Sequence, residues 1–257
     1  MAIVPVISII TPVFDGGDAY LLDAYESVRS QVLPAGWTWE WVVQEDGRTG
    51  RPGSLLPKDD QRVRFATGTR GGAGVTRTLG LARARGDLVR ALDADDLLSD
   101  GALARDIAVL EGAPDVAWCV SAALDLLPDG SLTPGPYDPP AGPLSYPQLR
   151  KQFEMNRFPI VSTHLTARTG LIRAVGGWPA LPALEALALL LVCAAVSPGV
   201  MLTTPGGIYR KHQAQTTAQP RYRDEAEFAT LHTAILTRLD SVEDSGWRWV
   251  SRIRKGQ

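Results

Sequence analysis

The sequence predicts an α/β fold: a mostly parallel, Rossmann-like sheet flanked by helices. Two observations support this fold class. Short β-rich runs alternate with apolar residues at helical spacing through the first half of the chain, and the ends of several of these runs carry aspartates. Alternating strands and helices are typical of βαβ units with a parallel sheet. Such a sheet binds its ligands outside the carboxyl ends of its strands.

The first half of the chain contains the clearest pattern. We expect strands over residues 6–11, 39–44, 63–66, 88–92 and 116–120. The first helix is indicated by apolar residues at steps of four, three and four: Leu21, Tyr25, Val28 and Val32. Two later helices are indicated in the same way by Val75, Leu79 and Ala82, and by Leu103, Ile107 and Leu110.

The second half is less regular. Residues 127–147 are rich in proline and glycine, which predicts a long ordered loop or a linker. Residues 151–207 mix short helices and strands, and the apolar run 186–196 is too short to span a bilayer, so we expect a buried helix there. We expect three parts: a nucleotide-binding half (1–121), an acceptor-binding half of the same domain (122–220), and a C-terminal helix with a basic tail (221–257).

Composition excludes some classes of function. The chain has 257 residues, 45% hydrophobic and 21% charged, and a net charge of −2. This balance gives no reason to expect nucleic acid as a partner. The two cysteines, Cys119 and Cys193, lie far apart in apolar runs and are expected to be buried thiols of a reducing compartment. The amino terminus lacks the basic region of a signal peptide, so we expect a cytoplasmic protein.

The most informative segment is RALDADDLLSD, in which an apolar run leads into Asp93, Asp95 and Asp96. Ser99 is expected to cap a following helix. Carboxylates at the end of a strand suit a hard cation such as Mg²⁺ or Mn²⁺, which can in turn hold a diphosphate. The alternative interpretation is an acidic turn that only caps the helix.

Two other strands end in TPVFDGG and QEDGRTG, so Asp15 and Asp46 are expected to face the same crevice as Asp93. Carboxylates there can accept a base N–H, accept a ribose hydroxyl, or bind a metal. The intervening segment GTRGGAGVTR has glycines that allow close approach of the backbone to a ligand. It lacks the Gly-Lys-Ser/Thr ending of a P-loop, and no GxGxxG follows the first strand.

Taken in order, these segments resemble the inverting glycosyltransferases of family two, which have the GT-A fold. The resemblance rests on SIITPVF, VVQEDG, RGGAGVTRTLGLARARGD, LDADD, GGWPALPALEA and YRKHQAQTT, between residues 8 and 217. It implies a metal-dependent enzyme that moves a sugar from a nucleoside diphosphate, with UDP ahead of dTDP, to an acceptor. The acceptor class stays open among saccharides, lipid-linked molecules and small molecules.

The resemblance also implies roles for single residues. Asp46 would accept the imide N–H of the base, Asp93 would hold the ribose or a metal-bound water, and the remaining donor contacts would come from Pro12, Val13, Asp15, Arg70, Arg77, Arg210 and Lys211. Asp95, in the DXD position, and His212 would bind Mn²⁺ or Mg²⁺, whose Lewis acidity offsets charge on the departing diphosphate. Alternatives remain: Asp46 as a turn residue, and Arg77 on a solvated helix face.

One position departs from the family pattern. The general base is usually the Asp of a Glu-Asp pair after Gly-Gly-Trp, but here the pair reads Glu185-Ala186. Three explanations stay open: Glu185 is the base, the acceptor is already ionised, or the protein is a catalytically impaired homologue that acts as a binding or assembly module. Glu185 can also be a first-turn acid that only favours the helix dipole.

The C-terminal segment GWRWVSRIRKGQ combines aromatic and basic side chains: Trp247, Arg248, Trp249, Arg252, Arg254 and Lys255. Such a segment can contact an anionic membrane surface or form a homodimer.

A nucleotidyltransferase also uses metal-bound phosphates on a parallel sheet, but the first strand is not followed by the expected glycine-rich, lysine-bearing loop.

Overall fold

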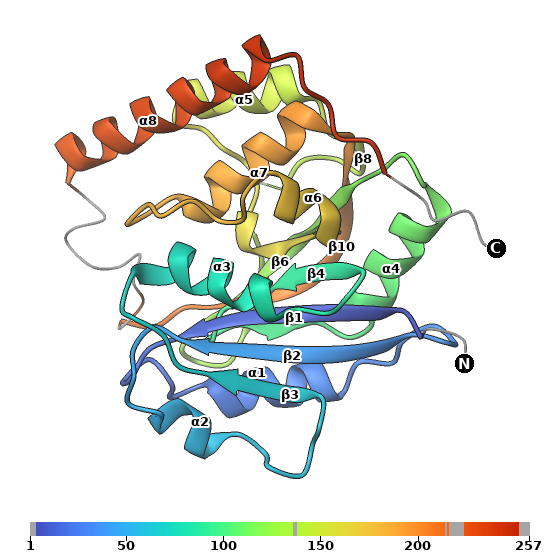
Figure 1. Ribbon diagram of the computed structural model, residues 1–257, viewed down its shortest axis with the longest axis vertical. Coiled ribbons are helices and arrows are strands. Elements are labelled where there is room, and N and C mark those ends of the chain that lie inside the picture. Colours follow the sequence, from blue (N-terminus) through green and yellow to red (C-terminus); the bar gives the residue numbers. More distant parts are fainter. Residues whose placement is uncertain (1–3, 136–137, 214, 216–223, 252–257) are drawn as a thin grey trace.

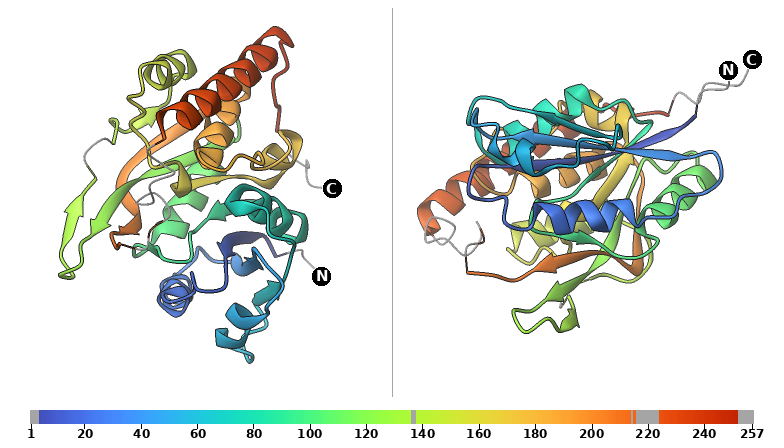
Figure 2. Two further views of the ribbon diagram at one scale, coloured as in Figure 1. Left: turned by 90° about the vertical axis from the view of Figure 1, so that its left-hand side faces the viewer. Right: turned by 90° about the horizontal axis from the view of Figure 1, so that it is seen from below.

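The computed structural model describes residues 4–135, 138–213, 215 and 224–251. Among these residues, ten strands form one mixed sheet in the order β3-β2-β1-β4-β9-β6-β10-β5, with β7 paired to β6 and β8 paired to β10. Helices cover both faces of this sheet (Figures 1 and 2): α3, α7 and α8 lie above it in Figure 1, and α1 lies on the other side. The predicted α/β fold, a central sheet flanked by helices, is therefore confirmed.

The first four strands of the sheet are all parallel. They are β1 (Val6–Val13), β2 (Thr38–Glu45), β3 (Val63–Ala66) and β4 (Leu88–Ala91), and β1 pairs with both β2 and β4. Because parallel strands end at the same edge, the residues that follow β1, β2 and β4 are brought together there. This edge carries the candidate site.

Four helices connect the elements of this half. They are α1 (Leu21–Arg29), α2 (Arg51–Leu55), α3 (Gly72–Arg83) and α4 (Ala102–Gly112). Helical periodicity predicts three of them. The exception is α2, which begins at Arg51 and has Pro52 in its first turn, where the fixed φ of proline is suitable. This helix has five residues, too few for a periodic pattern.

Alternation along β1 assigns its side chains to two cores. Ile7 and Ile9 are fully buried with the apolar faces of α1 and α4, whereas Ile10 is buried with Leu81 of α3. Successive residues of a strand point to opposite faces. The continuous apolar run of β1 is thus explained by a sheet that is covered on both sides.

The second half adds further strands, and some of them pair in the antiparallel direction. The strands are β5 (Leu97–Leu98), β6 (Trp118–Leu126), β7 (Leu132–Pro134), β8 (Gly142–Pro143), β9 (Leu165–Arg168) and β10 (Gly199–Arg210). Strand β9 is antiparallel to both β4 and β6, while β6 and β10 are parallel. Strand β6 runs across the expected boundary at residue 121, so one sheet joins the two expected halves.

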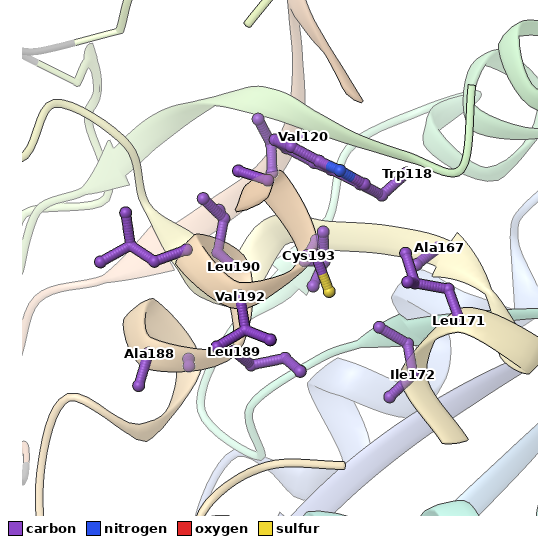
Figure 3. Close-up of a cluster of buried hydrophobic side chains, with 14 of the residues drawn as sticks. Trp118, Val120, Ala167, Leu171, Ile172, Ala188, Leu189, Leu190, Val192 and Cys193 are labelled. Atoms are coloured by element: carbon purple, nitrogen blue, oxygen red, sulfur yellow. The ribbon is translucent and has the colours of Figure 1, made fainter. Parts of the chain in front are cut away.

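The remaining helices are α5 (Tyr146–Glu154), the 3₁₀ turn η1 (Ser162–His164), α6 (Thr169–Ala174), α7 (Glu185–Val196) and α8 (Glu225–Asp244). Helix α7 is the buried helix that its apolar run predicts. Its side chains Leu189, Leu190 and Cys193 are fully buried among residues of β6, β9 and α6 (Figure 3). None of the helices in the described ranges is long and apolar enough to cross a membrane.

One expectation about local structure is wrong, and one pair of alternatives is decided. Ser99 does not cap α4, because Gly101 occupies the N-cap with a left-handed φ of 68°. The Ser99 hydroxyl instead donates a hydrogen bond to the Pro205 carbonyl. The proline-rich segment is not a linker, because within it β7 and β8 pair with β6 and β10.

Candidate functional site

The ends of β1 and β2 are held together by backbone contacts. The Asp46 N–H donates a 2.7 Å hydrogen bond to the Val13 carbonyl, and Pro12 lies opposite Gln44 in the parallel ladder. Val13 is buried, with 2% of its surface exposed, and its carbonyl is occupied by this bond to Asp46. These contacts place the first two predicted nucleotide-binding loops side by side.

Asp46 anchors the start of α3. Its carboxylate accepts hydrogen bonds from the backbone N–H groups of Gly71 at 2.6 Å and Gly72 at 3.2 Å. A carboxylate suits this position because the amino terminus of a helix carries partial positive charge and unpaired N–H donors. A carboxylate has about four acceptor positions, so Asp46 retains capacity for a further donor such as a base N–H.

The next two predicted donor contacts are at the surface. Asp15 is exposed and its carboxylate lies 3.3 Å from the Arg51 guanidinium of α2. Arg51 also lies 3.7 Å from Asp18, whose side chain is only 6% exposed. Arg70 is exposed in the segment that leads into α3. The structure therefore places Asp15 and Arg70 on the same rim as Asp46.

Arg77 is buried, not on a solvated face of α3. Its side chain is 3% exposed; Nη1 donates to Glu185 Oε1 at 2.6 Å, and Nη2 donates to Asp93 Oδ1. Burial by itself would lower the pKa of Arg77, but the two carboxylates outweigh burial and raise it. Arg77 therefore stays charged and joins the acidic loop to the first residue of α7.

The two predicted metal ligands meet in the structure. His212 Nε2 lies 2.9 Å from Asp95 Oδ2, although the residues are far apart in the chain. The Tyr20 ring packs against the His212 ring, with centroids 5.2 Å apart. Burial and the charge of Asp93 raise the pKa of Asp95, while His212 opposes this shift.

Asp96 does not cap a helix. It is 2% exposed and its Oδ1 accepts a 3.0 Å hydrogen bond from the Arg210 backbone N–H. Burial raises the pKa of Asp96 well above its ordinary value, and the charges of Asp93 and Asp95 add to this effect. The third aspartate therefore ties the acidic loop to the end of β10.

Arg210 and Lys211 already have partners. Arg210 donates to the Asp95 carbonyl at 3.0 Å and to the Asp23 carboxylate at 2.8 Å, and its guanidinium lies over the Tyr20 ring. Lys211 lies 3.1 Å from Asp125. A diphosphate contact by either residue requires exchange of these partners.

The structure separates the roles of Glu185 and Ala186. Glu185 begins α7 and reaches Arg77, after Leu184 adopts a left-handed φ of 62°. A non-glycine residue in that region is uncommon and is typical of a constrained segment. Ala186, at the position of the usual catalytic Asp, is buried in the apolar core around α7. The carboxylate available beside the acidic loop is that of Glu185.

The donor set fits a divalent cation with few protein ligands. Asp95 and His212 supply one carboxylate oxygen and one imidazole nitrogen at adjacent positions. Within the ranges that the structure describes, no group of three or more His, Cys, Asp or Glu residues is close enough to form a complete protein cage. Mg²⁺ is usually held by one or two carboxylates with substrate phosphates and water, and imidazole suits later metals.

Three residues of this region have no signal in the sequence. Tyr20 and Asp23, at the start of α1, contact His212 and Arg210. Gln215 is buried and accepts a hydrogen bond from the His212 N–H at 3.2 Å. The helical periodicity that identifies α1 depends on its apolar face, so it gives no information about polar residues that meet a distant strand.

Comparisons with known proteins identify the class. The profile of glycosyl transferase family 2 matches residues 8–135, which run from within β1 to just beyond β7 and include the whole acidic loop. The chain belongs to this family of glycosyltransferases. It is 34% identical over 118 residues to an O-antigen biosynthesis protein RfbC of Myxococcus xanthus, and 30% identical over 107 residues to an uncharacterized glycosyltransferase of Haemophilus influenzae. These matches cover 44% and 40% of this chain but only 9% and 41% of those proteins.

Solved structures define the fold as GT-A. A crystal structure of S. aureus TarS (residues 1–349) in complex with UDP superposes with a TM-score of 0.65 at 18% identity, over 80% of this chain and 61% of that one. The complex of the same protein with UDP-GlcNAc gives a TM-score of 0.65 over 83% of this chain and 60% of that one.

Proposed function

We propose that this protein transfers a sugar from a UDP-sugar to an acceptor, with inversion at the sugar carbon. The observation that carries the proposal is the buried Arg77, which joins Asp93, the proposed donor contact, to Glu185, the proposed base. The family assignment and the UDP and UDP-GlcNAc complexes of TarS support a uridine nucleotide as donor.

The donor would lie across the carboxyl edge of the sheet. Its base and ribose would meet the β1 and β2 ends, with the imide N–H directed to Asp46, while the diphosphate would approach Asp95 and His212. A Mn²⁺ or Mg²⁺ ion held by these two residues would supply Lewis-acid stabilisation of the departing diphosphate. Arg70, and Arg210 after exchange of its partner Asp23, would neutralise the remaining phosphate charge.

Glu185 is the group that we assign as base. In an inverting transfer, the acceptor oxygen forms a bond to the sugar carbon as the bond from that carbon to the diphosphate breaks, and a base takes the hydroxyl proton. Arg77 engages Oε1 of Glu185 and orients the carboxylate, so the proton would pass to Oε2. An acceptor that is already ionised would need no such base.

The proposal also assigns a role to the C-terminal segment that contains Trp247, Trp249 and Val250. The Trp249 N–H donates to the Val196 carbonyl at 2.9 Å, which fixes the segment to the end of α7, while Trp247 and Val250 remain exposed. Arg252, Arg254 and Lys255 lie outside the described residues. We expect this segment to form a homodimer contact or to give peripheral contact with anionic lipid. Vesicle flotation of the full chain, a Trp247→Ala/Val250→Ala variant and a chain ending at Ser251 would test the lipid contact. Equal flotation of all three would rule it out.

The donor assignment is tested by binding before transfer. UDP with Mn²⁺ should raise the melting temperature by mass action, and more than ADP or GDP at equal concentration. Incubation with UDP-sugars should then release UDP, which mass spectrometry distinguishes from pyrophosphate, the product of a nucleotidyltransferase. Binding without transfer or hydrolysis would favour the impaired binding module, and no thermal shift with any nucleoside diphosphate plus metal would overturn the donor site.

A further inference from the structure

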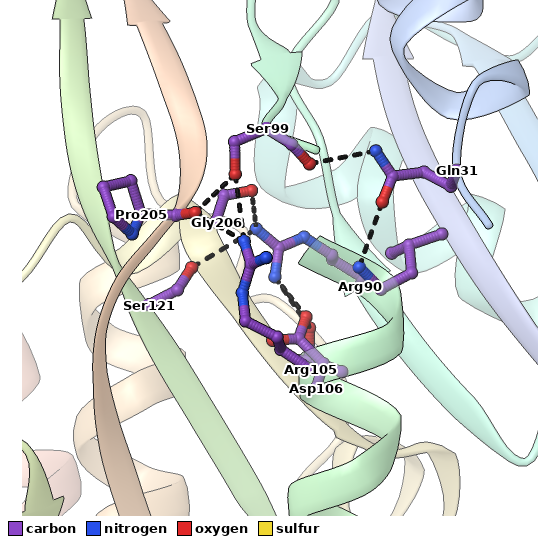
Figure 4. Close-up of polar contacts among 10 residues, drawn as sticks. Gln31, Arg90, Ser99, Arg105, Asp106, Ser121, Pro205 and Gly206 are labelled. Carbon is purple, nitrogen blue, oxygen red and sulfur yellow. Dashed lines mark hydrogen bonds and ion pairs between the residues drawn. The ribbon is translucent and has the colours of Figure 1, made fainter. Parts of the chain in front are cut away.

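A second arginine, Arg90 of β4, lies buried within the sheet near the acidic loop (Figure 4). It is 0% exposed, and its partners come from α4, β9, β6 and β10. Because β9 and β6 separate β4 from β10 in the sheet, the side chain of Arg90 connects strands that are not neighbours.

The guanidinium of Arg90 is engaged on two sides. Nη1 donates to Asp106 of α4 and, at 3.1 Å, to the Thr166 hydroxyl, which itself donates to Asp106 at 2.6 Å. Nη2 donates to the Gly206 carbonyl at 2.8 Å and lies 3.5 Å from the Ser121 hydroxyl. Asp106 fixes the guanidinium, and the guanidinium in turn holds the backbone of β10.

The contact with Gly206 falls where β10 departs from regular pairing. Strand β10 carries extra residues between Leu202 and Gly207, where β6 advances only from Ser121 to Ala123. A Cβ on Gly206 would lie 2.1 Å from the Ser121 hydroxyl, and a Cβ on Gly207 would lie 2.2 Å from the His164 ring. Only glycine allows the bulged backbone to rest on these buried polar groups.

A second contact fastens the same bulge to the acidic loop. The Pro205 carbonyl accepts hydrogen bonds from the Ser99 hydroxyl and, at 2.7 Å, from Arg105 of α4. Gln31 holds the Ser99 carbonyl at 3.0 Å from the other side. The bulge of β10 and the end of the segment that begins with Asp93 are therefore fixed to one another.

The strand leaves this bulge in the direction of the candidate site. Shortly after Gly206, the Arg210 N–H meets Asp96 and His212 meets Asp95. Two buried charges are a poor source of stability, because their desolvation offsets their attraction and apolar side chains of similar size often replace them without loss. Stability alone therefore does not account for a charged pair at this place.

We propose that Arg90 and Asp106 form a positioning pair: they fix the bulge of β10 so that Arg210 and His212 meet the acidic loop. The pair touches none of the proposed ligands and acts through the Gly206 carbonyl. The expected effect of the pair on metal and nucleotide binding rests on the proposed function, whereas its effect on the geometry of β10 does not.

The test replaces both charges together, in Arg90→Met/Asp106→Leu, so that no unpaired charge is left in the core. Amide hydrogen exchange at Arg210, followed by NMR without ligand, reports the contact with Asp96 directly. We expect a melting temperature close to that of the natural protein and exchange at Arg210 faster by about tenfold or more. The affinity for Mn²⁺ with UDP, by calorimetry, should fall by about 10- to 100-fold, the usual range for residues that support metal ligands.

The matched control is Glu40→Gln/Arg64→Met, which removes an arginine–carboxylate pair with a buried Glu40 at the opposite end of the same sheet. It should leave exchange at Arg210 unchanged. If the double variant does not fold, Arg90→Lys keeps the charge beside Asp106 but lacks the fork that reaches Gly206, and the same exchange is measured.

Unchanged exchange at Arg210 in the folded variant would overturn the positioning role. Faster exchange together with no UDP binding by the natural protein would instead leave the positioning role intact and count against the proposed function.

Discussion

Arg77 Nη1 donates a 2.6 Å hydrogen bond to Glu185 Oε1 and thereby joins α3 to the first residue of α7. The same guanidinium holds Asp93 through Nη2. The segment that presents the proposed base is thus oriented by a helix of the first half of the chain. A change at Arg77 should therefore affect both the donor contact of Asp93 and the proton transfer to Glu185.

Replacement of Arg77 by Met should destabilise the fold and abolish transfer. It leaves Asp93 and Glu185 facing each other without a counter-ion, which should lower the free energy of unfolding by about 3 kcal/mol, the lower end of the range for a broken buried pair because both carboxylates remain partly exposed. Urea unfolding measures the loss. Arg83→Met on the same helix is the control, and an equal loss there would show that the Arg77 pairs are not special.

Glu185→Gln should remove transfer while UDP binding persists. The amide oxygen can still accept a hydrogen bond from Arg77, but the amide cannot take a proton, so a loss of about 10²- to 10⁴-fold in rate is expected. Transfer and UDP affinity measured on the same preparation separate chemistry from binding. Full activity of Glu185→Gln would assign the reaction to an ionised acceptor or to another base.

Ala186→Asp should not create a family-type base. Ala186 lies in the apolar core around α7, so a carboxylate there would be desolvated and should cost about 2 kcal/mol or more. We expect a lower melting temperature and no gain in transfer or donor hydrolysis, with Ala186→Ser as a smaller polar control. A gain in activity would show that the start of α7 rotates to expose this position.

Asp95→Asn and Asp96→Asn should have different effects. Asparagine at 95 loses the charge that faces His212, so calorimetry should show weaker Mn²⁺ binding in the presence of UDP. Asparagine at 96 keeps an oxygen for the Arg210 N–H and removes a charge whose burial is unfavourable, so metal binding should change less. Undiminished binding in both variants would show that the acidic loop is structural.

His164 should make stability dependent on pH. Burial, with a contribution from the charge of Arg90, lowers the pKa of His164 from 6.5 to about 3. Between these values the unfolded chain binds a proton that the folded protein excludes, so the free energy of unfolding falls as pH falls, by about 2 kcal/mol at pH 5.

His164→Leu should reduce this pH dependence when urea unfolding is compared at pH 7.5 and 5. The raised pKa values of Asp95 and Asp96 increase the free energy of unfolding as pH falls, but this contribution is the same in the natural protein and in His164→Leu. His232→Leu is the control and should keep the slope. An unchanged slope in His164→Leu would contradict the assignment of the buried, neutral histidine.

The sequence by itself determined the strands and helices of the first half, except α2 and β5, and the edge of the sheet at which the candidate site lies. It could do so because periodicities of two and 3.6 follow from the burial of one face of each element, and because the carboxyl ends of parallel strands share an edge. The order of the segments from 8 to 217 also indicated the family before any contact was known.

Only the tertiary structure decided how the charges are paired. No local pattern distinguishes a buried Arg77 from a solvated one, places Asp95 beside His212, or directs Ala186 into the core. The environment of each residue is formed by residues that are distant in the chain. A buried charge is tolerated only beside a partner of opposite charge, and that partner comes from another element. The bulge of β10 and the two glycines that rest on Ser121 and His164 were likewise fixed by packing across the sheet.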